Sequence, residues 1–278
     1  MNQQPDTLCV ELTLRCPLRC IHCSANAAPE RREMLDTDVL IRRVRELGHL
    51  EALYLSGGEP FEHSQLAAIA EALTAHAGEV SIYSSGVMLG EKGPQPLAEG
   101  LIRQISRFVS RVDISLYSLS PDEHDAVTGV KGSLELSLQS IRNLRLYAVP
   151  FGIHFVPVHA AGAMLQVAQF AREAGAKRLH VLAVARQGRA SALRADSSEA
   201  LMSALQLLSR AKLGLEVMLS SQLRQQIGVA STARDALRPA FLDVNGHIYA
   251  NEGARGPAQR SLQTVNDSRV AELLADLA

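Results

Sequence analysis

Three cysteines lie at the spacing C-x₃-C-x₂-C in the run Arg15-Cys16-Pro17-Leu18-Arg19-Cys20-Ile21-His22-Cys23, directly after a short apolar alternation from Leu8 to Leu14. Three thiolates this close together on one loop can hold three irons of a 4Fe–4S cluster, and the fourth iron is then left without a protein ligand. An open iron can bind a small molecule and pass it an electron, which a fully ligated electron-transfer cluster does not do directly. The loop therefore indicates a catalyst.

Two other uses of the cysteines remain open. A zinc ion could be held by the loop with Cys9 or His22 as the fourth ligand, although structural zinc sites more often pair two C-x₂-C units and no second unit follows. A disulfide framework is disfavoured, because Cys9 is the only other cysteine in 278 residues. Cys9 itself lies in a strand-like stretch, and we expect it to be a small buried hydrophobic residue.

A second motif, Ser56-Gly57-Gly58-Glu59-Pro60, follows an apolar strand from Ala52 to Leu55. Its two glycines allow a positive φ and a close approach of the backbone, and Glu59 supplies an anionic acceptor for an ammonium group. On its own, the motif is typical of a turn between a strand and a helix. Behind the cysteine loop, in which an aromatic-type residue (His22) precedes the last cysteine, it resembles the radical S-adenosylmethionine (radical SAM) enzymes.

This resemblance implies both cofactors and a reaction. In that family the open iron of a 4Fe–4S cluster chelates the amino and carboxylate groups of S-adenosylmethionine (SAM), and the Gly-Gly-Glu-Pro stretch contacts the amino group. One cluster would here be held by Cys16, Cys20 and Cys23. Its electron would cleave SAM reductively to methionine and a 5′-deoxyadenosyl radical, and that radical would abstract hydrogen from a substrate carbon.

Further stretches resemble the same family. Val112 to Ser118 is similar to its ribose-contacting strand, with Ser115 as the candidate for a ribose hydroxyl. Pro121 to Gly129 is similar to a stretch of sequence in peptide-modifying members that carry a C-terminal cluster-binding extension. Gly188-Arg189-Ala190 resembles a Gly-Arg-Ala sequence that is common in that subgroup. Arg189 is either a cofactor contact or a solvated loop residue. The resemblance implies SAM contacts from His22, Gly57, Gly58, Glu59, Pro60, Ser85, Ser115 and Arg189.

The periodicity of apolar residues predicts an α/β fold independently of this resemblance. Apolar strands alternate with helix-period stretches as far as about residue 190, which implies parallel βαβ crossovers. Six units match the partial (β/α)₆ barrel of the family, with the motif loops converging at the carboxyl ends of the strands. Gly48, Gly78 and Gly175 are expected where helices stop. The expected helices are Asp36–Gly48, His63–Ala77, Pro94–Arg107, Leu134–Tyr147 and Ala163–Ala174.

The pattern changes after about Arg194, so we expect a barrel over residues 1–193 and a small α+β extension over 194–278. The extension is expected to contain a helix, a strand and a hairpin with a type I′ turn at Asn245-Gly246. This order resembles the SPASM or twitch-like extension of radical SAM enzymes, in which cysteines bind auxiliary clusters. No cysteine follows Cys23 here, so we expect an extension that keeps its fold without a metal. The expected segments are Ser197–Lys212, Leu215–Leu219, Phe241–Val244, His247–Ala250 and a final helix, Ser268–Leu277.

Composition favours a cytoplasmic enzyme. A chain of 278 residues with 47% apolar content can bury a large core, and no run approaches the roughly 20 apolar residues of a membrane span. Met1 to Thr7 lacks a signal-peptide pattern and is expected to be a short lead-in, with no leader-recognition domain before the barrel. A net charge of −1 without a long basic block does not favour nucleic acid as a partner.

Two classes of substrate, peptides and small metabolites, are compatible with the sequence. Within the resemblance, the extension favours modification of a ribosomally synthesised peptide, such as a crosslink or an epimerisation. A small metabolite is the alternative substrate, and a non-catalytic iron–sulfur protein is the alternative of a different class. Expected partners are an external electron donor of flavodoxin or ferredoxin type and a separate leader-peptide-binding protein. Tyr83 and Tyr117 are the candidate catalytic residues, as hydrogen donors, and His154, His159 and Arg186 are candidates to line the barrel mouth.

Overall fold

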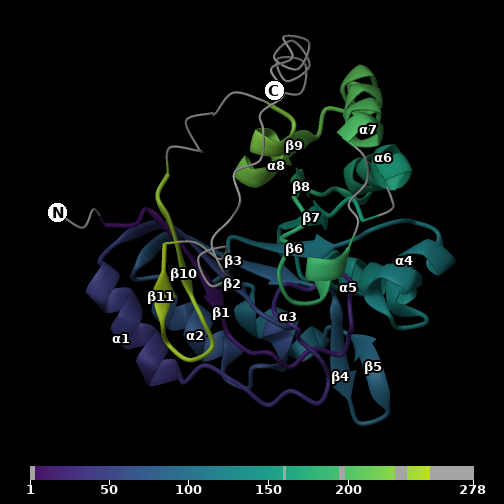
Figure 1. Cartoon of the computed structure of the whole chain (residues 1–278). Coiled ribbons are helices and arrows are strands. Elements are labelled where there is room, and N and C mark those ends of the chain that lie inside the picture. Colours follow the sequence, from purple (N-terminus) through teal and green to yellow (C-terminus); the bar gives the residue numbers. More distant parts are fainter. Residues whose placement is uncertain (1–3, 159–160, 194–197, 229–236, 251–278) are drawn as a thin grey trace.

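The computed structural model describes residues 4–158, 161–193, 198–228 and 237–250. Its centre is a nine-stranded sheet in the order β11-β10-β1-β2-β3-β6-β7-β8-β9, in which every neighbouring pair except β10–β11 is parallel (Figure 1). The strands of this sheet are β1 Thr7–Glu11, β2 Leu50–Ser56, β3 Ala77–Ser84, β6 Arg111–Ser115, β7 Phe151–Phe155, β8 Arg178–Val181, β9 Glu216–Leu219, β10 Pro239–Leu242 and β11 Ile248–Tyr249.

Helices connect the parallel strands, as an α/β fold requires, and the predicted fold class is confirmed. Strands β1, β2, β3, β6, β7 and β8 correspond to the six expected barrel strands. Helices that follow them in the chain pack against one side of the sheet (Figure 1). The helices are α1 Thr37–Leu47, α2 Leu66–Leu73, α3 Glu99–Ile105, α4 Pro121–Thr128, α5 Ser133–Leu146, α6 Met164–Ala174, α7 Ser198–Arg210 and α8 Ser221–Gln226.

The two faces of the sheet differ in character because side chains alternate along each strand. On the helix-covered face, Leu53 and Ile82 pack with Ile69 of α2 in the main hydrophobic core. On the opposite face the side chains are aromatic and polar. There the rings of Tyr83 on β3 and His154 on β7 lie 4.3 Å apart, although β6 runs between their strands. Strands in a flat sheet are about 4.8 Å apart, so this contact across two spacings shows that the sheet curves inward here.

Local sequence signals explain where several helices begin and end. Asp36 caps the start of helix α1, where its side chain accepts a hydrogen bond from the Val39 N–H, and Gly48, with a φ of +76°, caps its end. Gly175 ends α6 in the left-handed conformation, as predicted. Gly78 does not end a helix, because it lies inside β3 and α2 has already stopped at Leu73.

The predicted helix Pro94–Arg107 is wrong in its first part. Residues Gly93–Pro96 form β5, which pairs with β4 (Val87–Gly90) in a separate two-stranded hairpin, and helix α3 covers only Glu99–Ile105. Pro94 and Pro96 lie in a strand with a single neighbour, where the missing N–H groups cost no ladder hydrogen bond.

The hairpin of β10 and β11 forms where the Asn-Gly signal predicts it, but the type I′ turn is wrong. Gly246 alone has a positive φ in this turn, and a type I′ turn needs a second one at Asn245. The Gly246 N–H donates to the Asp243 carbonyl at 3.0 Å, as in a type I turn followed by a left-handed glycine. The Asp243 carboxylate accepts the N–H groups of Asn245 and His247, each at 2.9 Å, which favours this turn.

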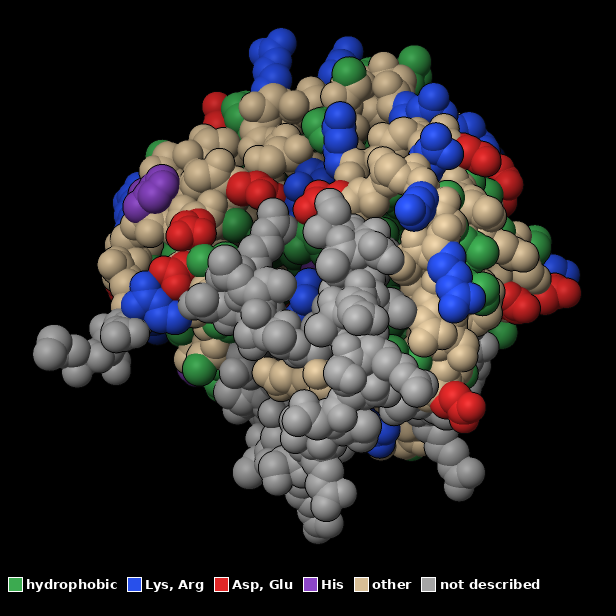
Figure 2. Space-filling model, turned by 90° about the horizontal axis from the view of Figure 1, so that it is seen from above, with side chains coloured by type: hydrophobic (Ala, Val, Ile, Leu, Met, Phe, Trp, Pro, Cys, Tyr) green, Lys and Arg blue, Asp and Glu red, His purple; other side chains and the backbone are tan. Residues whose placement is uncertain are grey.

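The later elements extend both edges of the sheet. Strand β9 pairs in parallel with β8, and β10 pairs in parallel with β1. The expected domain boundary at 193/194 coincides with the end of a described range at Leu193, and the expected helix Ser268–Leu277 lies outside the described residues. Where the chain is described, no helix is long and apolar enough to cross a membrane. Seen from above, the molecule carries Lys and Arg side chains interspersed with Asp and Glu (Figure 2).

Candidate functional site

The cysteine loop follows the carboxyl end of β1 and is fastened by backbone hydrogen bonds. The Ile21 N–H donates to the Val127 carbonyl and the Arg19 N–H donates to the Thr128 carbonyl, both at 2.9 Å, so the end of helix α4 supports the loop. Cys16 is buried, Cys20 and Cys23 are partly exposed, and all three are free thiols. A loop fixed through its backbone leaves these sulfur atoms available as ligands.

The three thiols also lie close enough to influence one another. Burial, followed by the neighbouring Cys23, raises the pKa of Cys20 to about 12. Burial likewise raises the pKa of Cys16, and the charge of Cys20 adds to that effect. The Ala27 N–H donates to the sulfur of Cys23 at 3.4 Å. A bound cluster of iron ions would offset the cost of three adjacent thiolates, so this donor set fits a cluster.

Zinc and a cluster make different demands on their ligands. Over the described ranges, no three or more His, Cys, Asp or Glu side chains are grouped so that they could hold a single metal ion. A zinc ion needs four ligand atoms around one centre. In a 4Fe–4S cluster each cysteine binds a different iron, so the sulfur atoms do not have to converge on one point. Cys9, the alternative zinc ligand, lies on β1 and is partly exposed rather than buried as we expected.

The Gly-Gly-Glu-Pro motif lies directly against the cysteine loop. The Gly58 N–H donates to the Thr13 carbonyl at 2.6 Å, and the Glu59 N–H donates to the Arg15 carbonyl at 2.9 Å. Gly57 has a φ of +122°, and a Cβ on it would overlap the Thr13 carbonyl oxygen. A Cβ on Gly58 would overlap the carbonyl oxygen of Arg15. Both glycines are therefore required for backbone contact between two motifs more than 40 residues apart.

Glu59 is fully buried and accepts four hydrogen bonds. Its Oε1 accepts from the Ser84 hydroxyl at 2.8 Å and from the Phe61 N–H, and its Oε2 accepts from the hydroxyl and the N–H of Ser85 at 2.6 and 2.8 Å. Burial raises the pKa of Glu59 to about 7, although these hydrogen bonds favour the ionised form. The role of Glu59 as an acceptor for the ammonium group of SAM stays a prediction. It requires that the ammonium group replace one of these four hydrogen-bond donors.

Ser84 was missed by the sequence analysis, and Ser85 was assigned to SAM rather than to Glu59. Ser84 is the last residue of β3, at the strand end next to the Gly-Gly-Glu-Pro turn. Because carboxyl ends of neighbouring parallel strands meet at one edge of a sheet, the Ser84-Ser85 pair could have been recognised as a partner of Glu59 from the expected strand order.

The two tyrosines proposed as hydrogen donors occupy different places. Tyr117 lies against the cysteine loop, with its ring edge-on to His22 at a centroid distance of 4.9 Å. Tyr83 lies inside the barrel, where its ring stacks on Tyr54 at 5.1 Å and meets His154. Burial raises the pKa of both tyrosines well above the usual value, so both stay protonated at neutral pH.

The remaining predicted residues also lie near the carboxyl ends of the strands or in the loops that follow. Ser115 is the last residue of β6 and pairs in register with His154 on β7. Pro60 begins a short helical turn and is buried. Arg189 reaches the cysteine loop, where its guanidinium group contacts backbone carbonyls. Arg186 is exposed, and His159 lies outside the described residues.

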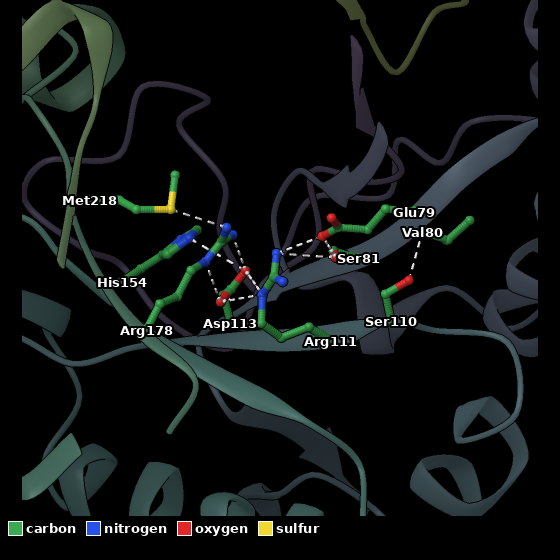
Figure 3. Close-up of polar contacts among 9 residues, drawn as sticks. All are labelled: Glu79, Val80, Ser81, Ser110, Arg111, Asp113, His154, Arg178 and Met218. Carbon is green, nitrogen blue, oxygen red and sulfur yellow. Dashed lines mark hydrogen bonds and ion pairs between the residues drawn. The ribbon is translucent and has the colours of Figure 1, made fainter. Parts of the chain in front are cut away.

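A second polar cluster lies deeper in the barrel, toward the amino ends of the strands (Figure 3). Asp113 accepts from Arg111 Nε at 3.0 Å and from Arg178 Nη2 at 2.9 Å, and His154 Nε2 is 3.7 Å from its Oδ2. Arg111 also pairs with Glu79 at 2.7 Å. Burial opposes ionisation of Asp113, but the surrounding imidazole and guanidinium groups hold its pKa below the usual value.

This deeper cluster, which we call the inner ion network (Glu79, Arg111, Asp113, His154 and Arg178), was not found from the sequence apart from His154. Burial lowers the pKa of His154 to about 4, so at neutral pH the two arginines are the cations that balance Asp113. A Cβ at Gly152 would overlap Asp113 Oδ1, so a glycine is needed beside the carboxylate. Alternation along β6 could have placed Asp113 on the same face as Ser115.

Comparison with protein families and curated proteins gives consistent matches. The profile of the Radical SAM superfamily matches residues 10–171. The chain is similar to the PqqA peptide cyclase of Xanthomonas campestris pv. campestris (strain B100), with 30% identity over 182 residues that cover 64% of this chain and 46% of that protein. It is similarly related to the PqqA peptide cyclase of Gluconobacter oxydans (strain 621H), with 30% identity over 183 residues, 64% of this chain and 49% of that protein. The chain thus spans about half the length of the curated relatives it matches.

Solved structures share the fold at low sequence identity. Streptococcus suis SuiB bound to the precursor peptide SuiA superimposes with a TM-score of 0.72 at 13% identity, over 93% of this chain and 62% of SuiB. AnSMEcpe bound to AdoMet and the Cp18Cys peptide superimposes with a TM-score of 0.66 at 15% identity, over 88% of this chain and 73% of that protein. These superpositions show that the strand and helix arrangement is that of the radical SAM partial barrel.

Proposed function

This chain belongs to the radical SAM superfamily of enzymes, and we propose that it holds one 4Fe–4S cluster on Cys16, Cys20 and Cys23 and modifies a ribosomally synthesised peptide. The observation that carries this proposal is the backbone contact between the cysteine loop and the Gly-Gly-Glu-Pro turn, made by Gly58 and Glu59. That contact places an anionic group and two glycines beside the cysteines, where a bound SAM would meet both motifs.

Each motif residue has a defined part in this proposal. The three thiolates bind the cluster, which when loaded supplies the electron that cleaves SAM and so provides the radical for hydrogen abstraction. Gly57 and Gly58 let the backbone approach the amino group of SAM. The Glu59 carboxylate exchanges a serine hydroxyl for that ammonium group, which is the stronger, charge-assisted partner. Ser115 binds a ribose hydroxyl in this proposal. Its neighbour in register, His154, is buried, which supports a site shielded from water.

A peptide substrate is supported by the relatives. The curated proteins to which this chain is similar are PqqA peptide cyclases, and the SuiB structure holds a precursor peptide. We assign residues 194–278 to a SPASM or twitch-like extension without auxiliary clusters, because no cysteine follows Cys23. An external electron donor of flavodoxin or ferredoxin type and a separate leader-peptide-binding protein complete the proposed system. The sequence has only four cysteines and none of them is in a disulfide, which favours the reducing cytoplasm as its location.

The test of the cluster and SAM chemistry uses anaerobically reconstituted full-length protein. With dithionite and SAM, and no peptide, we expect 5′-deoxyadenosine by mass spectrometry, lost in C20A and kept in C9A. Cys9 is the matched control because it is a cysteine on β1, outside the loop. Retained SAM cleavage in C20A would contradict the ligand assignment.

The substrate class is tested by co-expression with a small peptide encoded beside the gene. A mass change in the recovered peptide that depends on Cys16, Cys20 and Cys23 supports the peptide assignment. An unmodified peptide, together with 5′-deoxyadenosine production that is stimulated by a metabolite fraction, would favour the small-metabolite alternative.

A further inference from the structure

The turn that follows β8, the last of the six barrel strands, contacts the cysteine loop that follows β1, the first strand. This turn is the short helix Gly188–Ala192. The Arg189 side chain donates from Nε to the Cys20 carbonyl at 2.8 Å and from Nη2 to the Ala27 carbonyl at 2.9 Å. Its backbone N–H donates to the Cys23 carbonyl at 3.0 Å. Arg189 thus bonds to the backbone of two of the three cysteines.

The neighbours of Arg189 fit the same close contact. Gly188 has a left-handed φ of +54°, and a Cβ on it would overlap the carbonyl oxygens of Cys23 and Ser24. Ala190 has no exposed surface and belongs to the same small hydrophobic cluster as Tyr117. The Gly-Arg-Ala sequence is therefore explained by backbone-to-backbone packing on the cysteine loop and by the two carbonyls that Arg189 satisfies.

The charge of Arg189 also reaches the loop. Its guanidinium group lies within hydrogen-bond distance of the Cys20 carbonyl, at 2.8 Å, and of the Ala27 carbonyl, at 2.9 Å. Arg19 provides a contrast, because it immediately precedes Cys20 in the sequence but its guanidinium group is exposed and pairs with Glu30 at 2.7 Å. The guanidinium group of Arg189 thus contacts the loop, whereas that of Arg19 lies in solvent.

We propose that Arg189 is a positioning residue for the iron–sulfur cluster: it fixes the loop that carries Cys20 and Cys23, and its charge makes the bound cluster easier to reduce. This inference rests on the proposed function, since it presupposes that the three cysteines hold the cluster. A cation close to a cluster stabilises the state that carries one more electron, and net charge and hydrogen bonding are established controls of cluster potential. The two carbonyl contacts use two of the five N–H donors of the guanidinium group.

The test compares R189Q, R189K and the control R19Q as anaerobically reconstituted full-length proteins. We measure iron and sulfide retained after gel filtration, and the midpoint potential of the cluster by a redox titration followed with electron paramagnetic resonance. R189Q removes the charge, so its midpoint should become more negative by about 59 mV, a tenfold change in the one-electron equilibrium. R189K keeps the charge but cannot span two carbonyls with a rigid fork, so its midpoint stays near the wild-type value while its iron retention falls. R19Q should match the wild-type protein in both measurements.

Two results would overturn the inference. One is an R189Q protein with both the midpoint and the iron retention of the wild-type protein, and the other is an R19Q protein that shifts as much as R189Q. If R189Q does not fold, R189K decides, because undiminished iron retention in R189K would show that the fork is not needed. A failure of the proposed function is separate, since the wild-type protein itself would then retain no cluster.

Discussion

The two ends of the barrel interior hold their polar groups in different ways. Toward the amino ends of the strands, the inner ion network pairs side chain with side chain, and Asp113 is enclosed by two arginines and a histidine. At the carboxyl ends, the cysteine loop is held mainly through its backbone, by Gly58, Glu59 and Arg189. Buried charges that satisfy one another make the loss of any one partner costly, whereas a loop held by its backbone keeps its thiols available as ligands.

The largest expected effect on this contrast comes from Asp113→Asn. The substitution leaves Arg111 and Arg178 without their shared counter-ion inside the barrel, and breaking such a buried pair costs about 3–5 kcal/mol. Urea denaturation of the apo protein at pH 7 measures the loss. The control is Glu135→Gln, which removes an exposed ion pair with Arg142 and should leave the midpoint nearly unchanged. If Asp113→Asn is no more destabilising than this control, the inner ion network is not a stability element.

An intermediate effect is expected from Glu59→Gln, and it depends on pH. The pKa of Glu59 is raised from 4.5 to about 7 by burial, so the folded protein holds an extra proton between these values. Its contribution to stability is full below pH 4.5 and is lost as the pH rises through 7. We expect the free energy of unfolding of the wild-type protein, measured by urea denaturation, to fall by about 3 kcal/mol relative to that of Glu59→Gln between pH 5 and pH 8.5. If the free energies of unfolding of the two proteins change with pH in the same way, burial does not raise the pKa of Glu59.

The smallest of the three effects is expected from Gly58→Ala, which tests the backbone contact between the motifs. The new Cβ overlaps the Arg15 carbonyl, so the turn must move away from the cysteine loop. We expect at least a tenfold weaker binding of SAM to the reconstituted protein, about 1.4 kcal/mol, by equilibrium dialysis. Gly100→Ala is the control because a Cβ there meets nothing within 4 Å. Equal SAM affinity in both variants would mean that the contact does not form the cofactor site.

The contrast also explains what could be predicted from the sequence. The cysteine loop and the Gly-Gly-Glu-Pro turn are each contiguous in the chain, so their residue types and spacing are visible without a structure. Strand and helix alternation gave the fold class for the same reason, since each element shows its own periodicity. The proline-rich segment at Pro94 and Pro96 was misassigned because a hairpin strand at the surface has too few residues to show a period.

Contacts between distant strands could not be predicted in this way. Asp113 and Arg178 are 65 residues apart, and Arg189 and Cys20 are 169 residues apart. These pairs depend on strand register and on the curvature of the sheet, and a shift of one residue in a strand would turn Asp113 to the other face. The sequence suggested Arg189 as a cofactor contact or a solvated residue, and its bonds to the loop backbone came from the structure alone.

An open iron beside the Gly-Gly-Glu-Pro turn can be detected directly. Anaerobically reconstituted protein, reduced with dithionite, is examined by electron paramagnetic resonance before and after SAM is added. We predict a 4Fe–4S signal that changes on addition of SAM in the wild-type protein, and no such signal in Cys20→Ala. A wild-type protein that binds about four irons per chain, but whose reduced signal is unchanged by saturating SAM, would contradict a cluster held by three cysteines with a free iron.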